Sequence, residues 1–368
     1  MKTLQVSGIR PWGGGEQQLL FLCEELKSNY PEIENVVFCP YGAVLVEHLQ
    51  RRNIQVYNPK LAIKTSPTFF MKLGHYCKKH NIDVVHAHDP IAMFLVILAS
   101  FFYKMPRCIY SKKTSFPIKQ RAKTLFKYNH KIFQKIICVS NAVKKETALA
   151  VEDTSKLVTI YDGIEPTILQ NTPRVNIKDI LKLDATTRII LNIGNHTKPK
   201  DLSTFIKTAN EVLKTTEQVH FVQIGRYTEH SQPLLDLVKT LGLNNNMSFL
   251  GELEHASNAL TQAAVFLHTS KTEGLGQVIL EAMLHETPIV STAVGGIPEI
   301  IESGKNGLLS PAGDYKGLAM HVCRVLDGTL NTATLVKGNA ALVRSTFSKA
   351  VMAKNTVALY ETVQYLNR

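Results

Sequence analysis

Residues 264–301 alternate between two kinds of segment, and this alternation constrains the fold more than any other feature of the sequence. AVFLHTS (264–270) is a short apolar run typical of a buried strand, and PIVSTAV (288–294) is a second. A Gly-Leu-Gly turn and a helix-length segment separate them, and a Gly-Gly turn follows. Strands alternating with helices in this way predict a parallel sheet, in which the loops at the carboxyl ends of the strands bind ligands.

Two carboxylates, Glu273 and Glu281, lie eight positions apart within KTEGLGQVILEAMLHETP (271–288). Eight residues make about 2.2 helical turns, so we expect Glu281 two turns into a helix whose entry carries Glu273. Free backbone N–H groups and the positive end of the helix dipole suit a phosphate at that entry. Carboxylates beside it can accept hydrogen bonds from sugar and ribose hydroxyls, which predicts a nucleotide-sugar site. The alternative is an acidic first turn followed by a solvated face.

The segment resembles the E-x7-E signature of retaining glycosyltransferases of family 4. The resemblance continues in consistent order through blocks at 13–26, 136–147, 188–212, 220–225, 247–252 and 295–314. It implies an α/β protein with the GT-B fold, in which two Rossmann-like domains have parallel sheets that face each other across a cleft. It also implies a transferase that takes a sugar from a nucleoside diphosphate.

The 368 residues are too many for one core and suit two domains. We expect a Rossmann-like acceptor-binding domain at 1–165 and a Rossmann-like nucleotide-sugar-binding domain at 166–347. The family resemblance implies that a helix at 348–368 crosses back to the first domain. We place the linker in 163–187, which has two prolines and little periodicity. The predicted strands are LQVSGI, NVVFCP, IQVYN, DVVHAH, CIYSK, KIICVS, LVTIYDG, RIILNIG, HFVQIG, MSFLG, AVFLHTS, PIVSTAV and GLLSPAG.

Sugar transfer leaves negative charge on the departing diphosphate, and a lysine is a compact charge with three donors to meet it. Lys200 in GNHTKPKD stands at the position of the family's phosphate-binding lysine, and Lys198 is its local rival. By resemblance, Glu273 contacts the donor sugar and Glu281 binds ribose hydroxyls. We therefore expect Lys200 and Glu273 to be catalytic. The expected donor-binding residues are Glu281, Gly274, Leu275, Gly276, Gly14, Gly15, Asn195 and Arg226.

The chain departs from the family pattern at two places. Asn195 follows a strand-end glycine where an arginine is common, so more of the leaving-group charge falls to other groups such as Arg226. Lys112 and Lys113 stand where many members have a histidine, with the register ambiguous by one residue. A lysine acts as a base only if its pKa is strongly depressed. This fits a front-face mechanism in which the leaving phosphate takes the acceptor proton.

Further candidates for the cleft come from the first domain. Glycines 13–15 allow close backbone approach, and Glu16 opens the helix that follows. His86 and His88 in HAHDP either line the cleft or make local hydrogen bonds. The expected acceptor or other cleft residues are Glu16, His86, His88, Lys112 and Lys113. The sequence has no DxD-type pair of acids for a metal, so we expect no metal and no cofactor, with the nucleotide sugar as a substrate.

The formal net charge of +12 is concentrated in the first half of the chain. Residues 1–165 hold 23 Lys and Arg against 13 Asp and Glu, and residues 104–145 hold 12 basic residues and no acid. Lys119, Arg121, Lys123, Lys127, Lys131 and Lys135 have spacings that partly match one helix face. The block is either a solvated basic face or a contact with a membrane surface or anionic acceptor, at about 1 kcal/mol per well-placed charge. No nucleic-acid module is recognisable, so we expect no nucleic-acid partner.

Several features indicate the compartment. The apolar run at 91–103 has 13 residues, fewer than the ~20 of a spanning helix, and we expect a buried crossover helix there. Six scattered cysteines without a C-x-x-C motif favour a reducing compartment. MKTLQVSGIRPW has no long apolar region, so we expect no signal peptide. These features predict a cytoplasmic protein associated peripherally with the inner face of the membrane.

The sequence therefore predicts a retaining, metal-independent glycosyltransferase. It would move a sugar, with UDP as the expected nucleotide, to a glycolipid or polysaccharide of the cell envelope, of the lipopolysaccharide type. Three alternatives stay open. One is a nucleotide-sugar epimerase or phosphorylase of the same fold. Another is a dehydrogenase, although GGGEQQ does not supply G-x-G-x-x-G. The third is a non-catalytic basic membrane-binding protein with a decayed transferase fold.

Overall fold

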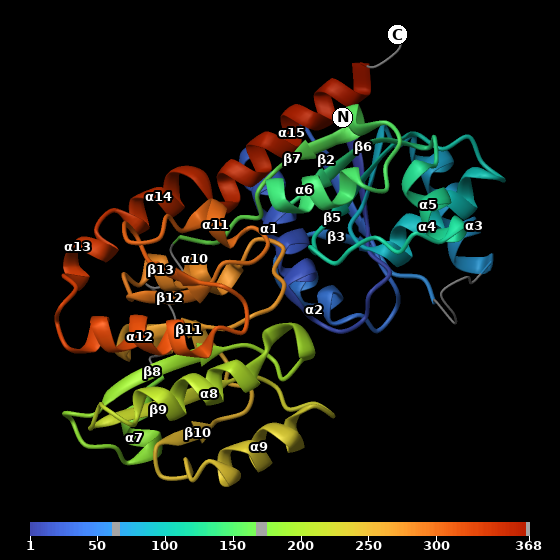
Figure 1. Cartoon of the computed structure of the whole chain (residues 1–368). Helices are drawn as coiled ribbons and strands as arrows, with labels where there is room; N and C mark the ends of the chain where they lie inside the picture. Colours follow the sequence, from blue (N-terminus) through green and yellow to red (C-terminus); the bar gives the residue numbers. More distant parts are fainter. Residues whose placement is uncertain (61–66, 167–174, 366–368) are drawn as a thin grey trace. The chain divides into compact units, whose positions relative to one another are not determined.

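The computed structural model describes residues 1–60, 67–166 and 175–365 (Figure 1). The chain divides into two compact units, Met1–Glu165 with Phe347–Arg368, and Pro166–Thr346. Part of the expected linker, 167–174, lies outside the described residues, as do the last three residues of the expected C-terminal helix.

The first unit is built on a seven-stranded parallel sheet with the order β3-β2-β1-β4-β5-β6-β7. Leu4 of β1 pairs with Val36 of β2 on one side and with Val85 of β4 on the other. The strand order therefore changes direction between β1 and β4. The strands are β1 (Lys2–Val6), β2 (Glu34–Phe38), β3 (Gln55–Tyr57), β4 (Val84–Ala87), β5 (Arg107–Lys112), β6 (Phe133–Cys138) and β7 (Leu157–Thr159).

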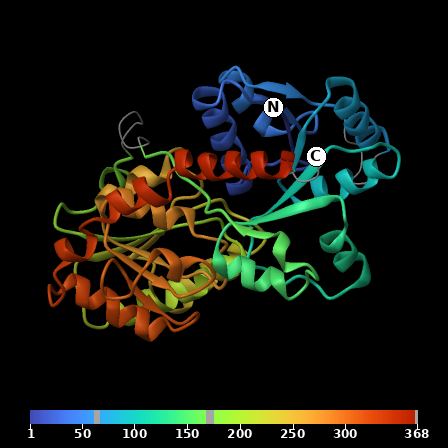
Figure 2. The same cartoon turned by 90° about the horizontal axis from the view of Figure 1, so that it is seen from above.

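Helices cover both faces of this sheet, because alternate strand residues point to opposite faces. Leu4 and Val6 belong to a core shared with α3 (Pro67–His80) and α4 (Pro90–Ser100). The other face packs against α1 (Gly14–Asn29), α2 (Val44–Arg51) and α15 (Lys349–Tyr365). Figure 2 shows α15 from a second direction. The remaining helices are α5 (Ala122–Asn129), α6 (Asn141–Ala148) and the short η1 (Thr154–Lys156).

The two ends of the first unit are joined next to α1. The backbone N–H of Ile164 donates to the Phe347 carbonyl at 2.9 Å, and the N–H of Lys349 donates to the Ile164 carbonyl at 2.9 Å. Gly163 is needed there, since a Cβ would lie 2.6 Å from the Lys349 Cα. The amide of Gln18 on α1 bonds both the carbonyl and the N–H of Gly163, at 2.7 and 2.9 Å. The last helix is thereby anchored to the first unit.

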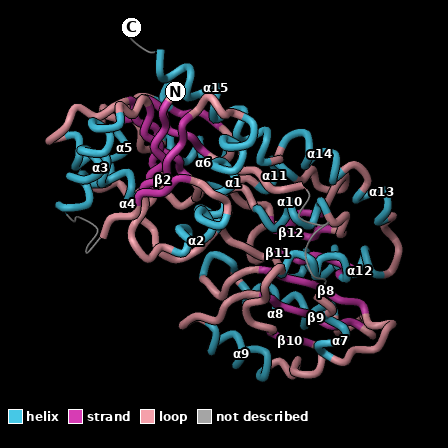
Figure 3. Tube along the Cα trace, turned by 180° about the vertical axis from the view of Figure 1, so that it is seen from behind, coloured by secondary structure: helices cyan, strands magenta, loops and turns pink. Residues whose placement is uncertain are grey.

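The second unit contains a six-stranded parallel sheet with the order β10-β9-β8-β11-β12-β13. The order changes direction between β8 and β11. α8 (Leu202–Val212) and α12 (Tyr315–Leu326) pack together against one face, whereas α10 (Gln277–Leu284) contacts α14 (Asn339–Thr346) (Figure 3). The strands are β8 (Arg188–Ile193), β9 (Val219–Ile224), β10 (Met247–Phe249), β11 (Ala263–His268), β12 (Ile289–Thr292) and β13 (Leu308–Ser310). The other helices are α7 (Ile177–Leu181), α9 (Ser231–Thr240), α11 (Ile297–Ile300), α13 (Thr332–Val336), η2 (Lys198–Lys200) and η3 (Ala256–Gln262).

All thirteen segments predicted as strands contain a strand, and the predicted α/β class with parallel sheets is confirmed. Residues 91–100 of the apolar run lie in α4, which is largely buried, whereas Phe101 and Phe102 follow the helix and are exposed. Asp89 caps this helix by accepting hydrogen bonds from the N–H groups of Ile91 and Ala92, at 2.8 and 2.9 Å. Among the described residues, no helix is both long and apolar enough to cross a membrane.

The basic segment at 104–145 is helical only in part. α5 has eight residues and carries only Lys123 and Lys127 of the spaced basic series. His130 has an extended backbone conformation and ends the helix, after which the chain returns into the sheet as β6. Lys131 therefore lies in the turn and Lys135 in the strand. Only part of the series therefore shares a helix, with Lys123 and Lys127 at i, i+4 spacing on α5, as the partial match of the spacings predicts.

Candidate active site

Two loops meet at the point where the strand order of the second unit changes direction. β8 leads into the loop that contains η2 and Lys200, and the neighbouring β11 leads into the loop that contains Glu273. In parallel α/β sheets such a switch point is where ligands bind. The topology therefore brings together the two residues that the sequence singled out as catalytic, although they are 73 positions apart.

The Glu273 carboxylate is held through one of its two oxygens. Its Oε1 accepts hydrogen bonds from Lys200 Nζ at 2.6 Å and from Ser270 Oγ at 2.8 Å, and lies 3.1 Å from His268 Nε2. The Glu273 and Lys200 side chains are 13% and 28% exposed, so water screens the ion pair only in part. Within the described part of the chain, Oε2 has no hydrogen-bond partner. This second oxygen can accept a hydrogen bond from a ligand.

The neighbours of Glu273 also set its protonation. Burial raises the pKa of Glu273, but the charge of Lys200 and the hydrogen bond from His268 outweigh this effect and hold the pKa well below its usual range. Burial lowers the pKa of His268, which favours the neutral imidazole. An ionised Glu273 can only accept, so His268 Nε2 is the donor in their contact. Ser291 Oγ lies 3.3 Å from Nδ1, placed to donate to the other ring nitrogen. Glu273 is therefore a fixed negative charge at neutral pH and no proton donor.

His268 and Ser270 were missed by the sequence analysis. They are the last residue of β11 and the second residue after it. The signal was present in AVFLHTS, because polar side chains at the carboxyl end of a buried parallel strand lie at the ligand edge of the sheet. Their contacts with Glu273 assign them a positioning role.

Backbone contacts fix the two loops to each other. The N–H of Lys271 donates to the Pro199 carbonyl at 2.7 Å, and Thr269 Oγ1 donates to the Lys200 carbonyl at 3.2 Å. Lys271 Nζ lies 3.3 Å from a carboxylate oxygen of Asp201. Asp201 has a φ of 43°, in the left-handed region. These contacts hold Lys200 in place before any ligand binds.

Two glycines shape the loop between the signature carboxylates. Gly295 has a φ of +54°, and a Cβ there would lie 1.7 Å from the Glu273 carbonyl oxygen. Gly276 has a φ of +107°, outside the right-handed helical region, so α10 begins only at Gln277. Glu273 precedes the helix and Glu281 lies about one turn into it. The expectation of Glu273 at the helix entry and Glu281 two turns in is wrong for this reason.

Glu281 is the second carboxylate of the pair, and it differs from Glu273. It is partly buried, and its carboxylate has no hydrogen-bond partner among the residues that the structure describes. Burial raises its pKa to about 7. A partly buried carboxylate without a partner is costly to the free protein and gains by accepting hydrogen bonds from a ligand.

The other donor-side candidates surround these groups. Asn195 Oδ1 accepts a hydrogen bond from the Arg226 N–H at 3.0 Å, and both side chains are exposed. A Cβ at Gly225 would lie 2.0 Å from the Gly194 carbonyl oxygen, so these strand ends need a glycine. Leu275 is buried, between the partly exposed Gly274 and the buried Gly276. Lys198, the rival of Lys200, is exposed and has no ion-pair partner in the described ranges.

In the first unit, the glycine loop lies next to two of the predicted residues, Lys113 and Glu16. Gly13 is the N-cap of α1, and Gly14 and Gly15 lie in its first turn. Lys113 Nζ donates to the Gly15 carbonyl at 3.2 Å. Glu16 is buried, which raises its pKa against opposing effects of a backbone hydrogen bond and of Lys113. These groups form a partly buried charged cluster around the loop.

The two histidines of the first unit are buried. His86 binds Tyr360 Oη with Nδ1 and Ser111 Oγ with Nε2, both at 2.7 Å, and burial lowers its pKa to about 3. His88 Nε2 lies 2.8 Å from Gln5 Oε1, and its Nδ1 has no partner within the described ranges. His86 thus makes the local hydrogen bonds that the sequence left as one alternative.

Lys112 is also occupied within the protein. Its side chain is buried, and Nζ donates to the carbonyl and hydroxyl of Thr114 and to the carbonyl of Phe116. Burial lowers its pKa to about 8. These acceptors hold the Lys112 ammonium group inside its own loop, and a contact of Lys112 with the acceptor stays a prediction.

In residues 1–60, 67–166 and 175–365, no group of three or more His, Cys, Asp or Glu side chains is arranged to hold a metal ion.

Comparisons with known proteins give the family. Residues 187–328 match the family described as Glycosyl transferases group 1, and residues 12–167 match Glycosyltransferase Family 4. The chain belongs to the group 1, family 4 glycosyltransferases. Among solved structures, it resembles Anabaena HepE in complex with UDP and glucose, with a TM-score of 0.86 at 20% identity over 98% of this chain and all of that one. The fold is GT-B.

Two curated relatives show the breadth of the family. The chain is 23% identical over 314 residues to N-acetyl-alpha-D-glucosaminyl L-malate synthase of Bacillus anthracis, which covers 80% of this chain and 77% of the relative. It is 30% identical over 175 residues to the lipopolysaccharide core biosynthesis glycosyltransferase LpsE of Rhizobium meliloti, covering 47% of this chain and 50% of the relative. The chain is thus a glycosyltransferase.

Proposed function

We propose that this glycosyltransferase retains the anomeric configuration, needs no metal, and moves a sugar from a UDP-sugar to a glycolipid or polysaccharide of the cell envelope. The acceptor is anionic, of the lipopolysaccharide type, and the reaction takes place at the cytoplasmic face of a membrane. UDP is proposed because HepE, which has the same fold, was solved with UDP and glucose. The acceptor class follows the LpsE relative and the basic first half of the chain.

One observation carries the proposal. A lysine–carboxylate pair lies at the switch point, and α10, which follows the same loop, carries a second carboxylate without a hydrogen-bond partner among the described residues. In the proposed complex, Lys200 moves from Glu273 to the diphosphate and offsets the charge that develops on the leaving group. Glu273 meets the sugar with the oxygen that the protein leaves unbonded. Glu281 accepts hydrogen bonds from the ribose hydroxyls.

The proton of the acceptor hydroxyl goes to the leaving phosphate in this proposal. The C–O bond between the sugar and the diphosphate breaks, and the acceptor oxygen forms its bond on the same face of the sugar. In the free protein, Lys200 and His268 hold the pKa of Glu273 low against the effect of burial. When Lys200 turns to the diphosphate, the hydrogen bond from His268 keeps Glu273 ionised. Its negative charge favours the positive charge that builds at the sugar ring. Lys200 and the entry of α10 take the part that a divalent cation has in other transferases.

Thermal unfolding with UDP, GDP, ADP and their sugars, in EDTA, tests the donor and the metal independence. A ligand at 100 times its Kd adds about 2.7 kcal/mol, which raises the Tm by roughly 2–4 °C in a protein of this size. We expect the shift with UDP and UDP-sugars, and its loss in Glu281→Ala. A shift only with GDP or ADP, or only after a metal is added, would contradict the proposal.

The reaction itself needs a product assay. Incubation of UDP-glucose with and without an acceptor glycolipid distinguishes transfer from epimerisation, because an epimerase changes the sugar without an acceptor. NMR of the product gives the anomeric configuration. An inverted product, or turnover that needs free phosphate as in a phosphorylase, would overturn the mechanism.

A further inference from the structure

Exposed phenylalanines gather on the α3–α5 side of the first unit. Phe101 and Phe102, directly after α4, are 62% and 64% exposed, and Phe126 on α5 is 52% exposed. The ring of His130 makes edge contacts with Phe101 at 6.1 Å and with Phe126 at 5.2 Å between centroids, so these side chains are contiguous. Phe102 stacks on the buried Phe70 of α3 at 5.7 Å. A contiguous group of exposed aromatic side chains marks an interaction surface.

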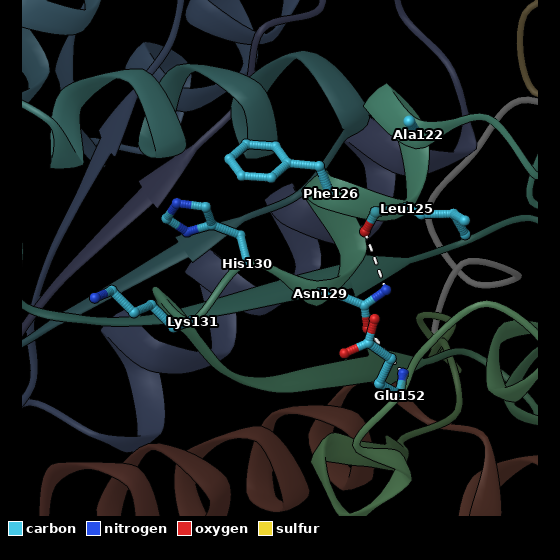
Figure 4. Close-up of a pocket in the computed structure, with 7 residues that line it drawn as sticks. All are labelled: Ala122, Leu125, Phe126, Asn129, His130, Lys131 and Glu152. Atoms are coloured by element: carbon cyan, nitrogen blue, oxygen red, sulfur yellow. Dashed lines mark hydrogen bonds between the residues drawn. The ribbon is translucent and has the colours of Figure 1, made fainter.

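A pocket of about 490 Å³ opens beside the same side chains (Figure 4). Phe126, His130 and Lys131 extend in the same direction, to the left in the view, whereas Asn129 and Glu152 approach each other. Asn129 is fixed, since it donates to the carbonyls of Leu125 and Ala150 and accepts from the Glu152 N–H at 2.8 Å. Ala122 and Leu125 complete the lining. The aromatic and cationic groups thus share one side of the pocket.

The cations around this surface are exposed as well. Lys104 follows the phenylalanine pair, Lys123 lies on α5 one turn before Phe126, and Lys131 follows His130; each has an exposed side chain. They belong to the segment 104–145, which has 12 basic residues and no acid. Glu152, the carboxylate in the pocket lining, comes from outside that segment. Exposed aromatic rings together with exposed lysines are complementary to a bilayer with anionic headgroups.

We propose that Phe101, Phe102 and Phe126, with Lys104, Lys123 and Lys131, form a docking surface for an anionic lipid bilayer. The phenylalanine rings enter the boundary between headgroups and acyl chains, and the lysines contact lipid phosphates. The inference deepens the proposed function, since it rests on an acceptor held in a membrane, but it assigns the contact to different residues from the donor site. It also differs from a purely electrostatic contact, because burial of the phenylalanine rings contributes binding free energy that salt does not screen.

Sedimentation of the full-length protein with vesicles tests the docking surface. The vesicles are phosphatidylcholine with or without phosphatidylglycerol, at low and at high salt. We expect binding only with phosphatidylglycerol and partial retention at high salt. The double variant Phe101→Ser with Phe126→Ser should bind about tenfold more weakly and be released fully by salt. Neutralising Lys123 and Lys131 to Gln should weaken binding about fivefold for each charge removed.

Matched controls keep the test specific. Met320→Ser removes a comparably exposed apolar side chain, 54% exposed, from α12 of the second unit. Lys182→Gln with Lys239→Gln removes two exposed lysines from that unit. Neither control should change vesicle binding. Because all replaced side chains are exposed, thermal unfolding should be unchanged in every variant.

Three outcomes would overturn the inference. One is equal binding to vesicles without phosphatidylglycerol, or none to either kind. A second is unchanged binding by the phenylalanine variant. The third is tighter retention on single-stranded RNA than on anionic vesicles. UDP-glucose binding, measured without vesicles, separates this inference from the proposed function. In the wild-type protein, absent vesicle binding with intact UDP-glucose binding overturns the docking surface alone, whereas vesicle binding without UDP-glucose binding overturns the donor site and leaves the docking surface standing.

Discussion

The two units have the same kind of sheet, with one change of direction in each, but they use the polar groups at that point differently. In the second unit, Glu281 and one oxygen of Glu273 are left without protein partners in the described structure. In the first unit, both ring nitrogens of His86 are bonded, and Asp89 caps α4 and accepts from the Gly8 N–H at 2.7 Å. The topology places polar residues at the ligand edge, and their internal hydrogen bonds decide which of them are available to a ligand.

Replacing Lys200 should have the largest effect on the activity and stability of the second unit. We expect Lys200→Ala to lower kcat/KM by about 10²–10³-fold, because it removes the cation that meets the leaving group. It should also lower the free energy of unfolding by about 2 kcal/mol, because the carboxylate of Glu273 stays partly buried without its cation. Lys198→Ala, in the same loop, is the control and should change neither quantity. Equal losses in the two variants would mean that the loop contributes only general positive charge.

Glu281→Gln should have the next largest effect, and one that depends on pH. The ionised carboxylate accepts hydrogen bonds better than the acid, and its pKa is about 7, so UDP-glucose affinity should rise from pH 6 to pH 8 in the wild type. UDP-glucose is the probe because its diphosphate does not titrate near neutral pH. At pH 8 the variant should bind about tenfold more weakly, and its affinity should be flat with pH. A flat wild-type profile in calorimetry would contradict the assignment.

Glu281→Gln should also change how the free energy of unfolding depends on pH. Glu281 has a folded-state pKa raised from 4.5 to about 7, so the folded protein binds the proton more tightly than the unfolded chain. The wild type should therefore lose up to about 3 kcal/mol of stability as the pH rises between these two values. Glu281→Gln should lack this loss and be the more stable protein at pH 8. Denaturant unfolding at pH 4.5 and pH 8 measures the difference.

A smaller effect is expected at His268, which touches Glu273 and acts through it. His268→Leu removes the donor at 3.1 Å and should lower kcat about tenfold with little change in KM. His268→Asn keeps an N–H donor and should recover most of this loss. A purely structural role predicts that both variants lower the Tm alike and that Asn gives no rescue. Steady-state kinetics with thermal unfolding distinguishes the two roles.

The smallest effect on donor binding should come from the first unit. His86→Phe removes the hydrogen bonds to the hydroxyls of Ser111 and Tyr360, of which Tyr360 keeps its bond to Gln5, and should cost about 2 kcal/mol of stability. UDP-glucose affinity at a temperature below unfolding should be unchanged. A loss of affinity of tenfold or more would show that the buried histidine is part of the donor site, and the contrast between the units would fail.

The strands could be predicted well because they are buried on both faces, so each is a short apolar run bounded by turns. The order of the strands was not predicted; it depends on contacts between distant segments. The pairing of β8 with β11, for example, joins residues more than 70 positions apart. The boundary of α10 was misplaced because the positive φ of Gly276 is a property of the folded loop, which Gly295 makes possible.

The site residues show the same difference between local sequence signals and contacts formed only in the fold. Lys200, Glu273 and Glu281 stood out by spacing and by resemblance, whereas His268 became visible only through its contact with Glu273. Lys112 matched a motif position, but the acceptors of its own loop hold it inside the protein. Sequence spacing identifies which residue types can meet a ligand. Three-dimensional hydrogen bonding determines which of them remain free to do so.

The joining of the ends of the first unit has a consequence for synthesis on the ribosome. Tyr360 of α15 is fully buried and bonds His86 of β4, and the Phe347 carbonyl receives the N–H of Ile164. Of the two units, the first is therefore begun earlier and completed later, since it lacks these partners until α15 leaves the exit tunnel. The second unit is contiguous and can fold earlier. A chain stalled before Phe347 should thus present a finished second unit attached to an unfinished, protease-sensitive first unit.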